Sequence, residues 1–72
     1  MNKKNKIKII VNGKLLMINS NFSVKNLIEK LKTPINKVAI ELNEEIVDKK
    51  KISKIILKNK DKIEIVHFIG GG

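Results

Sequence analysis

The dipeptide Asn12-Gly13 separates two apolar segments, residues 7–11 and 14–18, and constrains the fold of this chain more than any other feature. Asn-Gly is a strong signal for a β-hairpin, because both central residues of a type I′ turn need a positive φ. A two-residue turn also fixes which side chains share a face of the hairpin. Five apolar side chains are expected on the core face: Ile7, Ile9, Val11, Leu16 and Ile18. The sequence therefore predicts an N-terminal hairpin with one buried face.

An amphipathic helix is predicted over residues 23–32. Ser23 can cap this helix, because its hydroxyl can accept a hydrogen bond from a free N–H group of the first turn. Pro34 ends it, because the residue before a proline avoids the α region. Apolar residues with the spacing of one helical face follow Ser23, namely Val24, Leu27, Ile28 and Leu31. We expect this face to pack against a sheet.

Three later segments are expected to form strands. Residues 38–42 alternate between inward and outward positions, which predicts a half-buried strand. After a turn, residues 46–47 form a short strand. Residues 62–68 form the last strand, with Ile63 and Ile65 facing inward.

Between these last two strands, residues 48–51 indicate a charged loop and residues 52–56 one turn of 3₁₀ or α-helix. One helix against one mixed sheet of four to five strands is a two-layer α+β arrangement. We expect a single domain over residues 1–72, with residues 1–6 frayed and residues 69–72 forming a flexible glycine tail. A single helix cannot cover both faces of a sheet, so the outer face should meet water or a partner.

The composition excludes several classes of function. The chain has no cysteine, so it has no disulfide framework, thiolate nucleophile or cysteine-based metal site. Its one histidine, His67, has no serine, cysteine or acid arranged around it in the sequence and is expected to be a partly exposed structural residue. No metal site is expected. The absence of a signal peptide and of a long apolar stretch predicts a soluble, cytoplasmic protein without a membrane partner.

The net charge of +9 comes from 16 basic residues, all of which are lysine. A basic chain can bind nucleic acid or an acidic partner. Arginine, which reads phosphate and guanine in a bidentate manner, is absent, and so are tryptophan and tyrosine, which stack on bases. We therefore expect no nucleic-acid partner. The lysines are expected to form a solvated surface that helps to attract an acidic protein.

The order of these elements resembles the β-grasp fold of ubiquitin-like proteins. Residues 62–72, Lys-Ile-Glu-Ile-Val-His-Phe-Ile-Gly-Gly-Gly, resemble the C-terminus of the ThiS family, the bacterial sulfur carriers of thiamine biosynthesis. Residues 38–47 are similar to the family's strand and its Glu-Ile-Val stretch, and Asn12-Gly13 fits its first hairpin. Glu44 stands where the family usually has glycine, so we expect a different form of turn there. Further departures at residues 48–49 and 59–61 also fall in loops.

The resemblance implies a protein that is acted on by enzymes and is not itself an enzyme. A ThiF-like adenylyltransferase would use ATP and Mg²⁺ to join AMP to the carboxylate of Gly72. A persulfide, drawn from cysteine by a donor such as a cysteine desulfurase, would then displace AMP and leave a thiocarboxylate. A ThiG-like thiazole synthase would take the sulfur. Gly70 and Gly71 would let the tail enter the active site of a partner, and the carrier itself would bind no cofactor.

An apolar patch on the outer face of the sheet is expected to bind these partners, because a contiguous apolar patch on a small protein often marks an interface. Its members would be Ile10, Leu15, Met17, Ala39, Val66 and Phe68, with Ile69 at the start of the tail. Val66 and Phe68 are the strongest candidates, because they lie next to the glycines in the sequence.

Other functions stay open at this point. A sulfur carrier for molybdopterin synthesis and a ubiquitin-like modifier of lysines also end in paired glycines. A β-grasp module that only binds a partner non-covalently would need no carboxylate chemistry, and the glycines would then be a plain flexible end. We expect the free protein to be monomeric.

Overall fold

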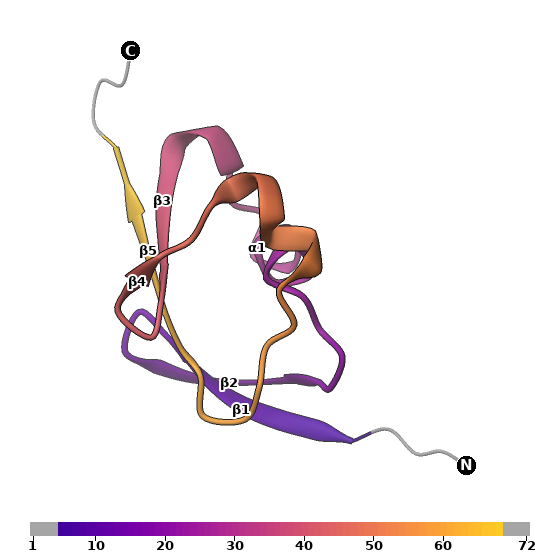
Figure 1. Cartoon of the computed structure of the whole chain (residues 1–72). Coiled ribbons are helices and arrows are strands. Elements are labelled where there is room, and N and C mark those ends of the chain that lie inside the picture. Colours follow the sequence, from indigo (N-terminus) through magenta and orange to yellow (C-terminus); the bar gives the residue numbers. More distant parts are fainter. Residues whose placement is uncertain (1–4, 69–72) are drawn as a thin grey trace.

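Residues 5–68, which the computed structural model describes, form a five-stranded sheet that packs against one α-helix (Figure 1). The elements in chain order are β1 (Lys6–Val11), β2 (Lys14–Asn19), α1 (Val24–Lys30), the 3₁₀ helix η1 (Ile35–Lys37), β3 (Val38–Leu42), β4 (Glu45–Ile46), the 3₁₀ helix η2 (Lys49–Lys54) and β5 (Lys62–His67). The strand order is β2-β1-β5-β3-β4. β1 and β5 are parallel, and the other neighbours are antiparallel. This arrangement confirms the predicted α+β, ubiquitin-like β-grasp fold.

The hairpin of β1 and β2 has the register that its two-residue turn predicts. Ile7 pairs with Ile18, and Ile9 pairs with Leu16. Asn12 and Gly13 have φ values of 50° and 82°, as a type I′ turn requires. A Cβ at Gly13 would meet nothing within 4 Å, so glycine is favoured there by its backbone conformation and not by lack of space.

The helix α1 begins where Ser23 caps it. The Asn26 N–H donates to Ser23 Oγ at 3.0 Å, and the Ser23 N–H donates to Asn26 Oδ1 at 2.9 Å, which together form a capping box. The predicted end of the helix was too late, because Leu31 is its C-cap. Leu31 is 38% exposed, so its predicted place in the core was wrong, whereas the other three apolar residues of that face are buried.

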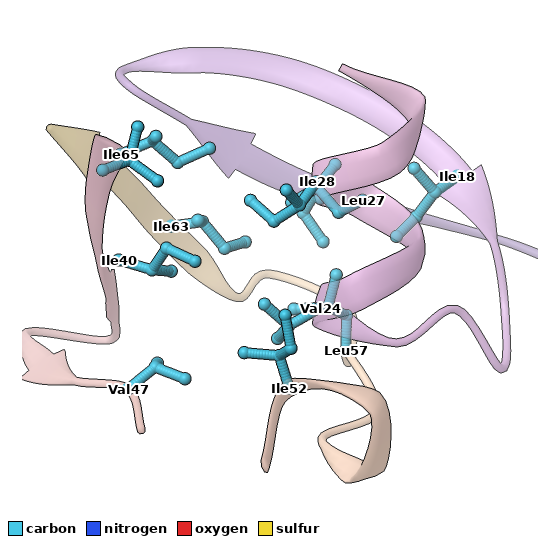
Figure 2. Packing of buried hydrophobic residues seen from close by; sticks show 12 residues of the cluster. Ile18, Val24, Leu27, Ile28, Ile40, Val47, Ile52, Leu57, Ile63 and Ile65 are labelled. Carbon is cyan, nitrogen blue, oxygen red and sulfur yellow. The ribbon is translucent and has the colours of Figure 1, made fainter. Parts of the chain in front are cut away.

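The core lies between the helix and the inner face of the sheet. Figure 2 shows Ile40, Ile63 and Ile65 directed from the sheet toward the helix. Leu57 also belongs to this core and is only 2% exposed, although no periodic pattern of apolar residues predicts its burial. It follows η2 in a segment that is neither helix nor strand. Its burial therefore depends on contacts with distant parts of the chain and not on a local pattern.

The segment between β3 and β5 differs from the prediction in three respects. The lysines of the charged segment lie in η2 and not in a loop, because Asp48 caps this helix by accepting from the Lys50 N–H at 2.9 Å. The short strand β4 begins and ends one residue earlier than predicted. The turn before it does not take the different form that we expected from Glu44. Asn43 and Glu44 have φ values of 52° and 72°, which are left-handed like those of the first hairpin turn.

Candidate functional site: the root of the C-terminal tail

The glycine run follows β5, so the position of β5 decides where the tail leaves the molecule. On one edge, β5 pairs with β3 from Leu42–Ile63 through Val38–His67. On the other edge, β1 reaches only the first two residues of β5, at Ile10–Lys62 and Val11–Ile63. Beyond that point β5 continues past the end of β1 and keeps only β3 as a neighbouring strand (Figure 1).

The side chain of Asn12 continues the ladder where β1 ends. Asn12 Oδ1 accepts from the Ile65 N–H at 2.7 Å, and Asn12 Nδ2 donates to the Ile65 carbonyl oxygen at 3.3 Å. The Asn12 N–H also donates to the Ile63 carbonyl oxygen at 2.9 Å. The hairpin turn therefore holds the middle of β5 from the side that β1 no longer covers.

The last described residue, Phe68, is held by two contacts. Its N–H donates to the Lys37 carbonyl oxygen at 2.9 Å, one residue beyond the end of β5. The Lys49 ammonium lies 5.1 Å from the centroid of the Phe68 ring, within the range of a cation–π interaction. The backbone direction is thus fixed as far as Phe68. Ile69, Gly70, Gly71 and Gly72, for which we predicted roles in the tail, lie outside the described residues.

Three of the predicted partner-binding residues lie together at this root, and we call them the root group: Ala39, Val66 and Phe68. Ala39 and Val66 are directly paired across β3 and β5. Val66 is 54% exposed and Phe68 is 50% exposed, while Ala39 is partly buried. Exposed apolar side chains that lie together on a small protein often mark a contact with a partner.

The other three residues form a separate cluster, the hairpin group: Ile10, Leu15 and Met17. Val66 lies four residues beyond Lys62, the partner of Ile10, which is roughly 13 Å along β5. The carboxylates of the directly paired Glu41 and Glu64 lie on the outer face between the two groups. The expectation of one contiguous patch was therefore wrong. The cause is the parallel register, which no periodicity in the sequence specifies.

His67 is exposed at the end of β5. Within residues 5–68, no three histidine, aspartate or glutamate side chains gather closely enough to hold a metal ion. None of the helices in this part of the chain is long and apolar enough to cross a membrane. The geometry supports a platform that presents the tail to another protein.

Comparison with known proteins identifies the family. A model of the ThiS family matches residues 5–72. The chain is similar to thiazole synthases of Paramagnetospirillum magneticum, at 38% identity over 66 residues, and Magnetococcus marinus, at 35% over 66 residues. Each match covers 92% of this chain but 20% of the relative, so the chain spans about a fifth of the length of these curated relatives.

Two proteins named ThiS match as well. The chain is 49% identical over 35 residues to the sulfur carrier protein ThiS of Bacillus subtilis, which covers 49% of this chain and 53% of that one. The crystal structure of the thiamine biosynthesis protein (ThiS) from Geobacter metallireducens matches with a TM-score of 0.77 and 29% identity, over 92% of this chain and 100% of that chain. The family match spans the sheet, the helix and the glycine run together, and on that basis this chain belongs to the ThiS family.

Proposed function

We propose that this protein is a sulfur carrier of thiamine biosynthesis and that it serves as a protein substrate of other enzymes. The observation that carries the proposal is the family match, which extends through the glycine run to residue 72. The structure adds support, because the central strand of the sheet leads directly to that run and is hydrogen-bonded as far as Phe68. A carrier of a reactive group requires a fixed base next to that group, and the hydrogen bonds of β5 supply one up to Phe68.

The chemistry begins at the carboxylate of Gly72, which is a poor electrophile because its charge is delocalised. Attack of a carboxylate oxygen on the α-phosphate of ATP releases pyrophosphate and forms an acyl-adenylate. The terminal sulfur of a persulfide then attacks the carbonyl carbon and expels AMP. A thiol cleaves the resulting acyl disulfide and leaves the thiocarboxylate. In this scheme an adenylyltransferase binds ATP and Mg²⁺, and a cysteine desulfurase supplies the persulfide sulfur.

The carrier contributes position. The four residues after Phe68 can span at most roughly 14 Å when fully extended. Glycine has no Cβ, so Gly71 and Gly72 can pass through a channel that would exclude other residues. Because the tail is short, the body of the carrier must dock close to the active site, and we assign this contact to the root group, with Ile69 beside it. Binding energy from the docked body then places the carboxylate against the reacting atom.

We propose a thiazole synthase of the ThiG type as the enzyme that accepts the sulfur. Two relatives that contain a stretch similar to nearly all of this chain are themselves named thiazole synthase. A carrier stretch and an acceptor enzyme in one polypeptide meet at a high effective concentration, which fits a direct transfer between them. For this chain the same transfer is proposed from its thiocarboxylate to the thiazole synthase, in the cytoplasm.

Incubation of the full chain with a ThiF-type adenylyltransferase, ATP, Mg²⁺ and a persulfide donor tests the proposal. The chain has no cysteine, so a thiol-selective alkylating reagent should label only the thiocarboxylate. Lysine-specific cleavage after Lys62 releases residues 63–72, which contain neither lysine nor methionine. This matters because oxidation of a methionine adds almost the same mass as exchange of oxygen for sulfur.

We expect the alkyl label on the peptide of residues 63–72 and nowhere else. Deletion of Gly72 should abolish the label, whereas Lys30→Ala, on an exposed position of α1, should not affect it. Transfer is then followed as loss of the thiocarboxylate on addition of thiazole synthase and its other substrates. A fully active adenylyltransferase that leaves this peptide unlabelled would contradict the proposal.

A further inference from the structure

The outer face of the first hairpin contains a hollow that the carrier chemistry does not use. Its volume is about 390 Å³, and its apolar part is the hairpin group, from β1 and β2. Leu15 is 65% exposed and Met17 is 51% exposed, so neither is part of the core. Large apolar side chains gathered around a hollow on the surface are more often a contact site than a random feature.

Three lysines surround this apolar floor: Lys6 and Lys8 from β1, and Lys60 from the turn before β5. Lys6 and Lys8 lie on the same face of β1, roughly 7 Å apart along the strand. The turn is fixed against β1, because Asn59 Oδ1 accepts from the Lys8 N–H at 2.9 Å and the Lys60 N–H donates to the Lys8 carbonyl oxygen at 2.6 Å. The fold thus brings the backbone of the three lysines to the edge of the same hollow.

No carboxylate compensates these lysines within residues 5–68. The one ion pair in this part of the chain joins Lys62 and Glu44, outside the hollow. The nearest acid in the turn, Asp61, accepts from the Lys58 N–H at 2.7 Å and from Asn43 Nδ2 at 3.0 Å. Three like charges around an apolar floor repel one another, and an acidic ligand would relieve this repulsion.

The character of the hollow selects the kind of ligand. A second copy of the chain would bring more lysines toward these lysines, since the net charge is +9. A nucleic acid would meet aliphatic side chains with no arginine and no aromatic ring among the lining residues. A protein segment with aliphatic side chains between carboxylates would match both the floor and the rim.

We propose that this hollow is a docking site for an acidic, aliphatic segment of a partner protein, with Ile10, Leu15 and Met17 receiving its apolar side chains. Lys6, Lys8 and Lys60 bind its carboxylates. The site lies at the opposite end of the outer face from the root group, so the segment can bind while the tail occupies an active site. The proposal does not depend on sulfur transfer, and it would hold for any function of the tail.

A synthetic peptide, Glu-Leu-Glu-Leu-Glu, blocked at both ends, is the probe, and binding is followed by amide chemical shifts of the ¹⁵N-labelled full chain at physiological ionic strength. We expect saturable shifts at Ile10, Leu15 and Met17 and none at Val66. Replacing the glutamates of the peptide by glutamines, or its leucines by serines, should weaken binding by about tenfold in each case.

Charge reversal in the protein supplies the matched control. Lys8→Glu combined with Lys60→Glu should weaken binding by about tenfold or abolish it. Lys25→Glu combined with Lys30→Glu makes the same change of net charge on exposed positions of α1 and should have little effect. The proposal is supported only if both the glutamates and the leucines of the peptide contribute to binding.

Four outcomes would overturn the proposal: no shifts at millimolar peptide, equal weakening by both pairs of reversals, equal binding of the glutamine peptide, or tighter binding of an RNA oligonucleotide with the same shifts. Concentration-dependent shifts of Leu15 and Met17 without any peptide would point to a second copy of the chain and would overturn it as well.

Discussion

The side chain of Asn12 forms a two-point hydrogen-bonded contact with the backbone of Ile65, 53 residues later in the chain. This asparagine therefore has two structural roles. It adopts the left-handed conformation of the hairpin turn, and it completes the edge of β5 beyond the end of β1. Because β5 directly precedes the tail in the sequence, a residue of the first turn helps to fix the strand to which the tail is attached.

Asn12→Gly should separate these two roles, since glycine keeps the turn but loses both side-chain hydrogen bonds. We expect a loss of about 1–3 kcal/mol in the free energy of unfolding, because the part-buried N–H and carbonyl groups of Ile65 then lose these hydrogen bonds. The matched control is Asn21→Gly, at an asparagine with φ of 67° whose side chain makes no hydrogen bond with residues 5–68. Urea denaturation of both variants makes the comparison, and equal losses would argue against the Asn12–Ile65 contact.

Glu44→Gly should stabilise the protein by about 0.5–1 kcal/mol, because Glu44 has φ of 72° and a side chain is disfavoured in that conformation. The Lys62–Glu44 contact at 3.9 Å is exposed on both sides and adds little. Glu44→Gln serves as the control, since it removes the charge and keeps the strained backbone. If the glutamine variant were as stable as the glycine variant, the gain would be electrostatic and not conformational.

Glu41 and Glu64 are directly opposite on neighbouring strands, and like charges in such a pair are destabilising. Glu64→Gln should therefore raise the free energy of unfolding by about 0.2–1 kcal/mol at low salt. The gain should shrink as salt screens the two carboxylates. A double-mutant cycle with Glu41→Gln measures the coupling. Additive effects of the two changes would indicate that the carboxylates do not interact.

Leu57→Ala should destabilise the protein by about 2–5 kcal/mol, because a fully buried leucine leaves a cavity when it is truncated. Leu31→Ala, at a residue that is 38% exposed, should cost less than about 1 kcal/mol. Thermal or urea unfolding measures both losses. The helical pattern in the sequence predicts burial of Leu31 and not of Leu57, so it would predict the larger loss for Leu31→Ala.

The root group should matter for thiocarboxylate formation but not for stability. Phe68→Ser and Val66→Ser are each expected to slow formation by about tenfold at low carrier concentration, as central apolar contacts do in interfaces. Ile56→Ser, at an apolar residue that is 45% exposed and lies before β5, is the control and should leave the rate unchanged. Intact melting temperatures for the root variants exclude a folding defect. A rate that drops equally in the control would exclude a specific docking role.

The sequence predicted those parts of the fold in which local rules decide. Asn12-Gly13 determined the register of β1 and β2, and Ser23 determined the start of α1, because turn and cap chemistry act over a few residues. Leu57 was missed, since its burial depends on contacts with distant segments and leaves no periodic pattern. The burial of Leu31 was overestimated, because α1 ends at Lys30 and Leu31 is only its C-cap.

In the candidate site, too, the sequence predicted the local features and missed those that depend on long-range pairing. Alternation placed Val66 and Phe68 on the outward side, and the exposed fractions agree with that. It could not show that Ile10, Leu15 and Met17 lie in a separate cluster, because the pairing of β1 with β5 joins segments about 50 residues apart in the chain. It also treated the lysines around these residues as general surface charge, whereas the turn at Lys60 gathers three of them around one hollow.

The position of β5 has a consequence for when the protein can fold. This strand follows every other element in chain order, yet it fills the middle of the sheet, between β1 and β3. During synthesis on the ribosome, the β1–β2 hairpin and β3 cannot join into one sheet until β5 has emerged. Such long-range pairing folds slowly compared with helical chains of the same size. The complete sheet therefore requires that β5 has been synthesised, so an enzyme that recognises the folded surface would not bind a chain that ends before β5.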